Sequence, residues 1–139
     1  MNEKTVTLPQ LEKIAADFIS TLTVGDVVYM KGDLGAGKTT FVRAALQSLL
    51  GPKEHVPSPT FTLVQTYETT QGFIWHYDLY RIDDPAEVLE LGMDEAFSQG
   101  ITFIEWPERM RFIYTPKHYV VQLNAADNEH ERVVKIVRS

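Results

Sequence analysis

An eight-residue segment of this chain has residue types and a spacing suited to phosphate chemistry. It matches the pattern G-x-x-x-x-G-K-[S/T] at every fixed position, and its residues are Gly32, Asp33, Leu34, Gly35, Ala36, Gly37, Lys38 and Thr39. Glycines let the backbone turn tightly enough to point successive N–H groups at phosphate oxygens, and a helix that follows adds the positive end of its dipole. The pattern predicts a binding site for a nucleoside triphosphate with magnesium.

The last two residues of the pattern have separate roles. Lys38 would reach the β- and γ-phosphates, and the Thr39 hydroxyl would hold Mg²⁺. The flanking sequence predicts a strand over residues 26–31 and a helix over residues 39–50, which Gly51 and Pro52 stop. A glycine turn that binds nothing is the alternative, but such a turn requires neither the lysine nor the threonine.

A phosphate-binding loop needs a carboxylate at the end of a neighbouring strand to orient Mg²⁺ or the attacking water. Glu105 closes a predicted apolar strand over residues 101–104, and ligands of open α/β sheets bind at the carboxyl ends of strands. The alternative is a carboxylate that is simply solvated at the end of a strand. The apolar residues before Glu105 and the Trp106 that follows it argue against this alternative. Asp78 lies in an aromatic-rich strand, where the pattern alone fits an exposed carboxylate as well as a functional one.

Further polar residues are weaker candidates. Thr60 either senses the γ-phosphate through Mg²⁺ or begins a strand that Pro59 stiffens, and the sequence leaves both open. The candidate charge stabilisers for a transferred phosphoryl group are Arg43, Arg81 and Arg109. The 4 histidines have no metal-ligand spacing, and the lack of an N-K-x-D guanine signature favours ATP over GTP.

Hydrophobic periodicity predicts the elements that position these residues. Thr7 caps a first helix, with Gln10 as its capping-box partner. Strands over residues 61–68 and 73–80 form an antiparallel hairpin, and a helix begins at about Ala86 and ends by Gly100. Two more strands, over residues 119–123 and 133–137, flank a polar turn, so the sheet is expected to be mixed.

Composition limits the class of protein. With 139 residues, 44% of them hydrophobic and 23% charged, the chain is expected to form a single domain over residues 1–139. It has no cysteine, no apolar run of membrane-spanning length and no secretory signal, so we expect a cytoplasmic protein without a membrane partner. A net charge of −6 has the wrong sign for a protein that grips nucleic-acid backbone, so any involvement with RNA is expected to be indirect.

Four motifs in this order resemble the bacterial TsaE family over nearly the whole chain. They are residues 32–40 (GDLGAGKTT), residues 58–64 (SPTFTLV), residues 78–81 (DLYR) and residues 105–108 (EWPE). Members of that family are small ATPases required, with the proteins TsaB and TsaD, to make threonylcarbamoyladenosine in tRNA. The resemblance implies an α/β fold: a P-loop NTPase-like three-layer domain with a mixed, partly antiparallel sheet.

The resemblance also implies roles for residues. It places the phosphates and Mg²⁺ on the loop through Lys38, Thr39 and Thr40, makes Glu105 the second magnesium-linked residue, and assigns Asp78 and Trp106 to hydrolysis. It puts Thr60 beside the nucleotide, and Thr7 and Arg132 at the edge of the adenosine. ATP and Mg²⁺ are therefore the expected cofactors, a TsaB–TsaD complex the expected partner, and tRNA an indirect one.

Two other functions remain open from the sequence. A small-molecule kinase of the P-loop class would need an acceptor pocket and an arginine-bearing lid, for which the short connections leave little chain. A nucleotide-dependent binding module without significant turnover is the other alternative. Phosphate release from the purified protein, with and without partners, separates this binding module from a partner-directed ATPase.

Overall fold

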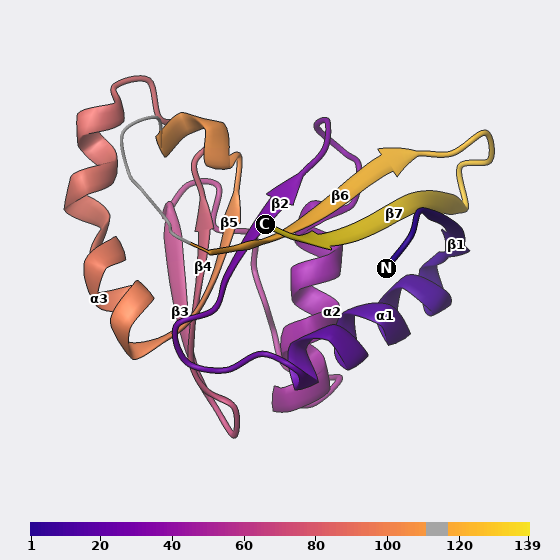
Figure 1. Cartoon of the computed structure of the whole chain (residues 1–139), viewed down its shortest axis with the longest axis horizontal. Coiled ribbons are helices and arrows are strands. Elements are labelled where there is room, and N and C mark those ends of the chain that lie inside the picture. Colours follow the sequence, from indigo (N-terminus) through magenta and orange to yellow (C-terminus); the bar gives the residue numbers. More distant parts are fainter. Residues whose placement is uncertain (111–116) are drawn as a thin grey trace.

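The computed structural model describes residues 1–110 and 117–139, drawn in colour in Figure 1. Its strands are β1 (Lys4–Thr7), β2 (Val27–Lys31), β3 (Val64–Thr69), β4 (Gly72–Asp78), β5 (Gly100–Glu105), β6 (Tyr119–Ala125) and β7 (Glu131–Arg138). Its helices are α1 (Leu8–Ser20), α2 (Lys38–Leu50) and α3 (Met93–Gln99), with two 3₁₀ helices, η1 (Pro85–Leu91) and η2 (Pro107–Met110). None of the helices in the described ranges combines the length and the apolar character needed to cross a bilayer.

The strands form one sheet of mixed direction. Its order is β1-β7-β6-β2-β5-β4-β3, with 7 strands. The central strand β2 pairs in parallel with β5 and with β6, and β5 pairs in parallel with β4. Towards the edges β3 is antiparallel to β4, β7 to β6 and β1 to β7. The predicted mixed, partly antiparallel sheet is confirmed, and so is the hairpin that β3 and β4 form.

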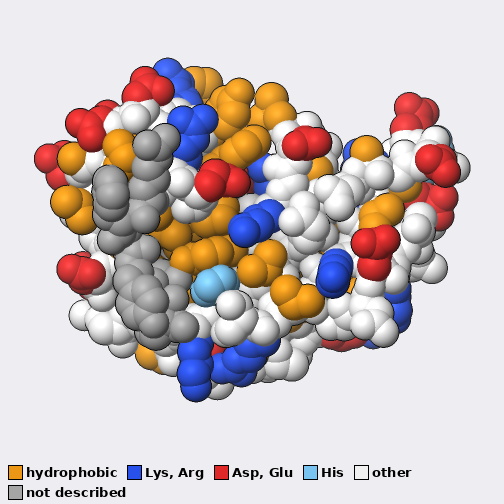
Figure 2. Space-filling model, turned by 45° about the horizontal axis from the view of Figure 1, so that its top comes forward, with side chains coloured by type: hydrophobic (Ala, Val, Ile, Leu, Met, Phe, Trp, Pro, Cys, Tyr) orange, Lys and Arg blue, Asp and Glu red, His pale blue; other side chains and the backbone are white. Residues whose placement is uncertain are grey.

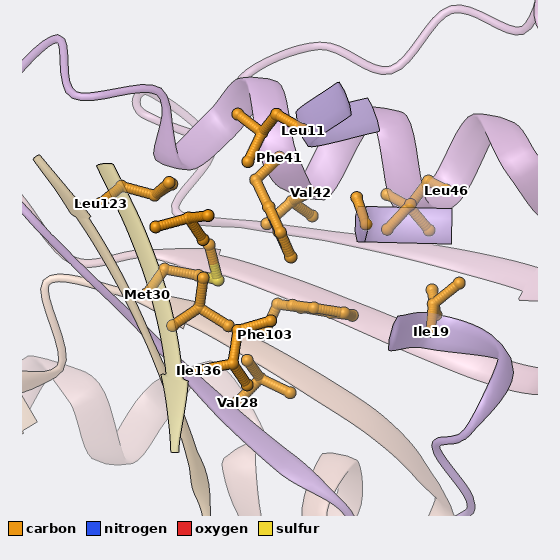
Figure 3. Packing of buried hydrophobic residues seen from close by; sticks show 14 of the residues in the cluster. Leu11, Ile19, Val28, Met30, Phe41, Val42, Leu46, Phe103, Leu123 and Ile136 are labelled. Carbon is orange, nitrogen blue, oxygen red and sulfur yellow. The ribbon is translucent and has the colours of Figure 1, made fainter. Parts of the chain in front are cut away.

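Helices cover the two faces of the sheet, which gives the predicted three layers. Helices α1 and α2 lie together on one side, and α3 lies on the other side (Figure 1). The core under α1 and α2 includes Phe41 and Leu46 of α2 packed against Met30 and Phe103 of the sheet (Figure 3). The core under η1 and α3 is smaller and includes Tyr77, whose hydroxyl donates to the Leu91 carbonyl at 2.8 Å. Strand β5, buried along its whole length, lies between these two cores.

The predicted capping box at the start of α1 is confirmed. The Thr7 hydroxyl accepts from the Gln10 N–H at 3.4 Å, and the Gln10 side chain accepts from the Thr7 N–H at 2.8 Å. Gly51 ends α2 as expected, with φ 116°. Local chemistry was sufficient for both predictions because each depends on residues close together in the chain.

The structure corrects the predictions for two strands and one helix. The strand expected over residues 61–68 begins only at Val64, because the Leu63 N–H closes a turn on the Pro59 carbonyl at 2.6 Å and Leu63 has φ 70°. The strand expected to reach residue 80 ends at Asp78. The helix expected from about Ala86 is a 3₁₀ helix that stops at Gly92 (φ 71°), after which α3 begins.

The sheet contains one strand that the sequence did not predict. Strand β1 precedes α1 directly and pairs with β7, so that Thr7 lies opposite Glu131. A run of only 4 residues carries too little periodicity to be recognised without its partner. Its effect is to bring the start of α1 beside the β6–β7 hairpin.

A tight approach between β4 and β5 leads to a test of the fold. A Cβ on Gly100 would lie 2.2 Å from the Phe73 carbonyl oxygen and 2.5 Å from the Trp75 ring. We expect Gly100→Ala to lower the free energy of unfolding by about 3 kcal/mol, at the upper end for overpacking, because the backbone carbonyl cannot move aside. Urea-induced unfolding measures this change in the free energy of unfolding. The control is Gly92→Ala, whose Cβ meets nothing within 4 Å and which carries only the cost of a left-handed φ, about 1 kcal/mol. Equal losses in the two variants would contradict the close packing.

Candidate functional site

Residues 32–39, called the P-loop below, join the end of β2 to the start of α2. Gly32, Gly35 and Gly37 all have positive φ, at 148°, 81° and 105°. A Cβ on Gly32 would lie 2.2 Å from the Leu123 carbonyl oxygen, so only glycine fits there. The backbone therefore has the tight turn and the following helix N-terminus that the phosphate-binding pattern predicts.

The Lys38 side chain is folded back into the site. Its Nζ donates to the Gly32 carbonyl at 2.6 Å and lies 3.6 Å from the centre of the Trp106 ring. Burial lowers the pKa of Lys38, and the carboxylates of Glu105, Glu108, Asp78 and Asp33 oppose that shift in decreasing order. Trp106 itself has φ 59°, so the chain turns sharply directly after Glu105. A cation and an aromatic face are thus held together at the end of β5.

Glu105 is buried and has partners from two other elements. The Thr39 hydroxyl on α2 lies 3.0 Å from Glu105 Oε1 and 2.9 Å from Oε2. On β4, His76 Nε2 lies 2.6 Å from the same Oε2. The two residues expected to share Mg²⁺, Thr39 and Glu105, therefore lie in contact with each other.

Asp78 is also buried, and it lies opposite Glu105 in the parallel register of β4 and β5. Its Oδ2 accepts from the Thr60 hydroxyl at 2.8 Å, and its Oδ1 accepts from the Tyr80 N–H at 3.0 Å. Because Thr60 uses its single hydrogen on Asp78, Ser58 must be the donor in the 2.7 Å contact between the two hydroxyls. These donors hold the Asp78 carboxylate in one orientation.

Two cavities meet at the P-loop. The first, called the phosphate cavity, measures about 320 Å³ and is lined by Leu34, Gly35, Gly37, Lys38, Thr39, Thr40, Thr60, Asp78, Tyr80, Glu105, Trp106 and Arg132. The second, called the hairpin cavity, measures about 430 Å³ and is lined by Thr7, Leu8, Pro9, Leu11, Gly37, Thr40, Glu129, His130 and Arg132. Both are lined by Gly37, Thr40 and Arg132, so they are neighbours along the start of α2.

Most of the predicted site residues therefore lie together. The phosphate cavity is shared by Lys38, Thr39, Asp78, Glu105 and Trp106, and the hairpin cavity includes Thr7. Neither cavity is lined by Gly32, Asp33 or Ala36, although the pattern includes them in the P-loop. Gly32 acts instead through its carbonyl, which accepts from Lys38.

The three candidate arginines lie elsewhere. Arg43 donates to the Val56 carbonyl at 3.0 Å and Arg109 to the Ile82 carbonyl at 3.0 Å. The Arg81 guanidinium lies 4.8 Å from the centre of the Phe61 ring. None of the three lines either cavity. Among the described residues, Arg132 lines both cavities, and its guanidinium donates to the carbonyls of Glu129 and Glu131 at 2.9 and 2.8 Å.

Sequence reasoning missed His76, Tyr80 and part of the hairpin cavity. His76 precedes Asp78 by two positions, so strand alternation places both on the same face of the sheet. That signal was present, but a search for metal-ligand spacing does not detect it. Glu129 and His130 had no comparable signal because only the pairing of β1 with β7 brings their turn to α1.

The residues present are suited to Mg²⁺ shared with phosphate oxygens. Among the described residues there is no cluster of three or more His, Cys, Asp or Glu able to hold a metal. Mg²⁺ in nucleotide sites takes only one or two protein oxygens and completes its shell with phosphates and water. Thr39 and Glu105 supply hard oxygen donors, in contact with each other, on the wall of the phosphate cavity.

Comparisons with known proteins cover almost the whole chain. Residues 5–134 match the family model described as "Threonylcarbamoyl adenosine biosynthesis protein TsaE". A Rickettsia felis protein named "tRNA threonylcarbamoyladenosine biosynthesis protein TsaE" is 40% identical over 128 residues, which are 92% of this chain and 74% of that protein. An Aquifex aeolicus protein of the same name is 38% identical over 127 residues, 91% of this chain and 87% of the relative.

The fold also has a counterpart among solved structures. The crystal structure of Bacillus subtilis YdiB aligns with a TM-score of 0.76 and 25% identity, over 97% of this chain and 84% of that one. The family match spans every residue of both cavities, from Thr7 to Arg132.

Proposed function

The chain belongs to the TsaE family of threonylcarbamoyl adenosine biosynthesis proteins, and from that premise we propose that it is an ATPase that serves this tRNA modification through a TsaB–TsaD complex. The observation that carries the proposal is the convergence of Lys38, Thr39, Asp78 and Glu105 in one cavity at the carboxyl ends of β2, β4 and β5. We place this activity in the cytoplasm, where tRNA is modified.

The P-loop would bind the triphosphate. Its backbone N–H groups and the N-terminus of α2 attract phosphate oxygens, and Lys38 would exchange the Gly32 carbonyl for the β- and γ-phosphates. Thr39 and Glu105 would hold Mg²⁺, which when bound neutralises phosphate charge and supports the leaving group. The adenosine would extend into the hairpin cavity, with Thr7 and Arg132 at its edges.

Asp78 would orient the attacking water. Its carboxylate is held by Thr60 and by the Tyr80 N–H, and it lies beside Glu105 on the neighbouring strand. A fixed carboxylate at this place can accept a hydrogen bond from water and direct its lone pair at the γ-phosphate. Trp106, tilted at 50° against Tyr80 with ring centres 5.0 Å apart, would help close this side of the cavity to solvent.

The proposed partner relation leads to a direct test. In Figure 2, acidic side chains lie at the left and right sides of the face and also near its centre, where basic side chains lie beside them. With a net charge of −6, the chain lacks the phosphate neutralisation that nucleic-acid affinity requires. We therefore expect no appreciable binding to tRNA alone at physiological salt, but binding to TsaB–TsaD that differs at least about fivefold between ATP and ADP.

Calorimetry with tRNA, with TsaB–TsaD, and with TsaB–TsaD plus either nucleotide measures these affinities, and phosphate release measures turnover with and without the partners. The control is the Lys38→Ala variant, whose partner binding should no longer respond to nucleotide. Strong binding to tRNA alone, or partner binding indifferent to nucleotide, would contradict the proposal. Absence of phosphate release under all conditions would favour a binding module instead.

A further inference from the structure

His76 is a buried polar residue that the proposed reaction does not yet use. Its side chain is fully buried, and it lies on β4 with Phe103 of β5 opposite it in the register. Its Nδ1 has no hydrogen-bond partner among the described residues. An apolar side chain would fill this place without leaving a polar atom unpaired, so packing alone does not explain an imidazole here.

The contact that explains the imidazole is with Glu105. His76 Nε2 lies 2.6 Å from Glu105 Oε2. Because an ionised carboxylate only accepts hydrogen bonds, a hydrogen bond at this contact requires a proton on Nε2 that the imidazole donates. In the neutral imidazole that tautomer leaves Nδ1 as an acceptor, and no partner for Nδ1 is present in the described ranges.

Glu105 is then held at both its main chain and its side chain. The Leu79 N–H donates to its carbonyl at 3.1 Å, and His76 donates to its carboxylate. The Thr39 hydroxyl has a single hydrogen for the two carboxylate oxygens, from which it lies 3.0 and 2.9 Å. Without His76, that one hydroxyl would be the remaining side-chain donor to the carboxylate among the described residues.

We propose that His76 is a positioning residue that fixes the Glu105 carboxylate, by donating from Nε2 to Oε2, in the orientation that Mg²⁺-dependent nucleotide binding requires. The inference rests on the proposed function, because it assumes that Glu105 and Thr39 hold Mg²⁺ with the nucleotide. Carboxylates that bind metals are commonly oriented by such a second hydrogen bond, whose loss weakens metal affinity by about 10- to 100-fold.

Three variants test the proposal. His76→Phe and His76→Leu remove the donor and keep an apolar filling, whereas His76→Gln places an amide N–H near the position of Nε2. Affinity for the ATP analogue AMP-PNP is measured by calorimetry in Mg²⁺ and again in EDTA, and Mn²⁺ affinity in the presence of AMP-PNP is measured by electron paramagnetic resonance. The control is Thr102→Val on β5, which removes a different buried polar atom, a hydroxyl without a partner in the described ranges.

We expect His76→Phe and His76→Leu to lose about 10-fold or more in Mg²⁺-dependent affinity and in Mn²⁺ affinity, with affinity in EDTA unchanged. His76→Gln should retain most of the Mg²⁺-dependent affinity, and Thr102→Val all of it. Equal losses in Mg²⁺ and in EDTA, or no loss at all, would overturn the positioning role. Failure of the unmodified chain to bind AMP-PNP would instead refute the proposed function and, with it, this inference.

A measurement on the unmodified protein avoids any dependence on folding of the variants. Nitrogen-15 NMR of the His76 imidazole should show a protonated Nε2 and an unprotonated Nδ1. The opposite tautomer would overturn the proposal, because the contact with Glu105 Oε2 would then lack a donor from His76.

Discussion

Replacing Lys38 with alanine is expected to lower the affinity for Mg²⁺–ATP by at least about 100-fold and to abolish measurable hydrolysis. Within the described residues, Lys38 is the only lysine on the wall of the phosphate cavity. Hydrogen bonds from a charged donor contribute about 1.5–3 kcal/mol each, and Lys38 would make more than one of them to the β- and γ-phosphates. Isothermal calorimetry with ATP and Mg²⁺ measures the fall in affinity.

The fold should tolerate this substitution. Alanine at this position removes one hydrogen bond to the Gly32 carbonyl and one interaction with the Trp106 ring, each contributing about 1 kcal/mol. Removing a cation whose pKa is lowered by burial offsets part of that destabilisation. The matched control is Lys53→Ala, an exposed lysine beyond the end of α2, which should bind ATP normally. Hydrolysis by a folded Lys38→Ala protein would contradict the assignment of the P-loop.

Replacing Asp78 with alanine is expected to keep ATP bound and to slow its hydrolysis by about 100-fold or more. In the structure Asp78 is held by Thr60 and by the Tyr80 N–H, and it makes no hydrogen bond to the P-loop within the described residues. Its proposed contact is with the attacking water, so its loss acts mainly on the transition state. Single-turnover phosphate release gives the rate, and calorimetry gives the affinity.

Glu105→Ala is the matched comparison, because Glu105 lies directly opposite Asp78 in the sheet and carries the same charge. Since Glu105 contacts Thr39, its removal should weaken Mg²⁺-dependent binding itself, whereas Asp78→Ala should not. The same loss of nucleotide affinity in both variants would contradict the assignment of Mg²⁺-dependent binding to Glu105 and of water orientation to Asp78.

The parts of the molecule that the sequence predicted correctly depend on residues close together in the chain. The P-loop turn follows from glycines whose positive φ other residues rarely adopt, as Gly32 and Gly37 illustrate. The capping box of Thr7 and Gln10 forms across a single helical turn. The β3–β4 hairpin follows from two strand patterns on either side of a short turn. The mixed sheet was expected from the two strand patterns near the C-terminus, which became β6 and β7.

The tertiary structure decided which of these residues meet. Strand order and register bring Thr39 to Glu105 across a separation of 66 positions, and His76 to Glu105 across 29. A local sequence pattern does not predict which distant residues come into contact. The pairing of β4 with β5 depends on how all the strands pack against the two hydrophobic cores. The same holds for Thr60, which reaches Asp78 because the chain turns at Leu63 before β3 begins.

The hairpin cavity is the part of the site that the sequence alone predicts least well. It exists because β1 pairs with β7 and so places the start of α1 beside Arg132. The sequence contains the residue types for phosphate binding in one segment, where backbone stereochemistry alone dictates the shape. The hairpin cavity, which would receive the rest of the nucleotide, is lined by residues from near both ends of the chain. Those residues come together only when the whole sheet packs, which depends on the free energy of burying its two cores.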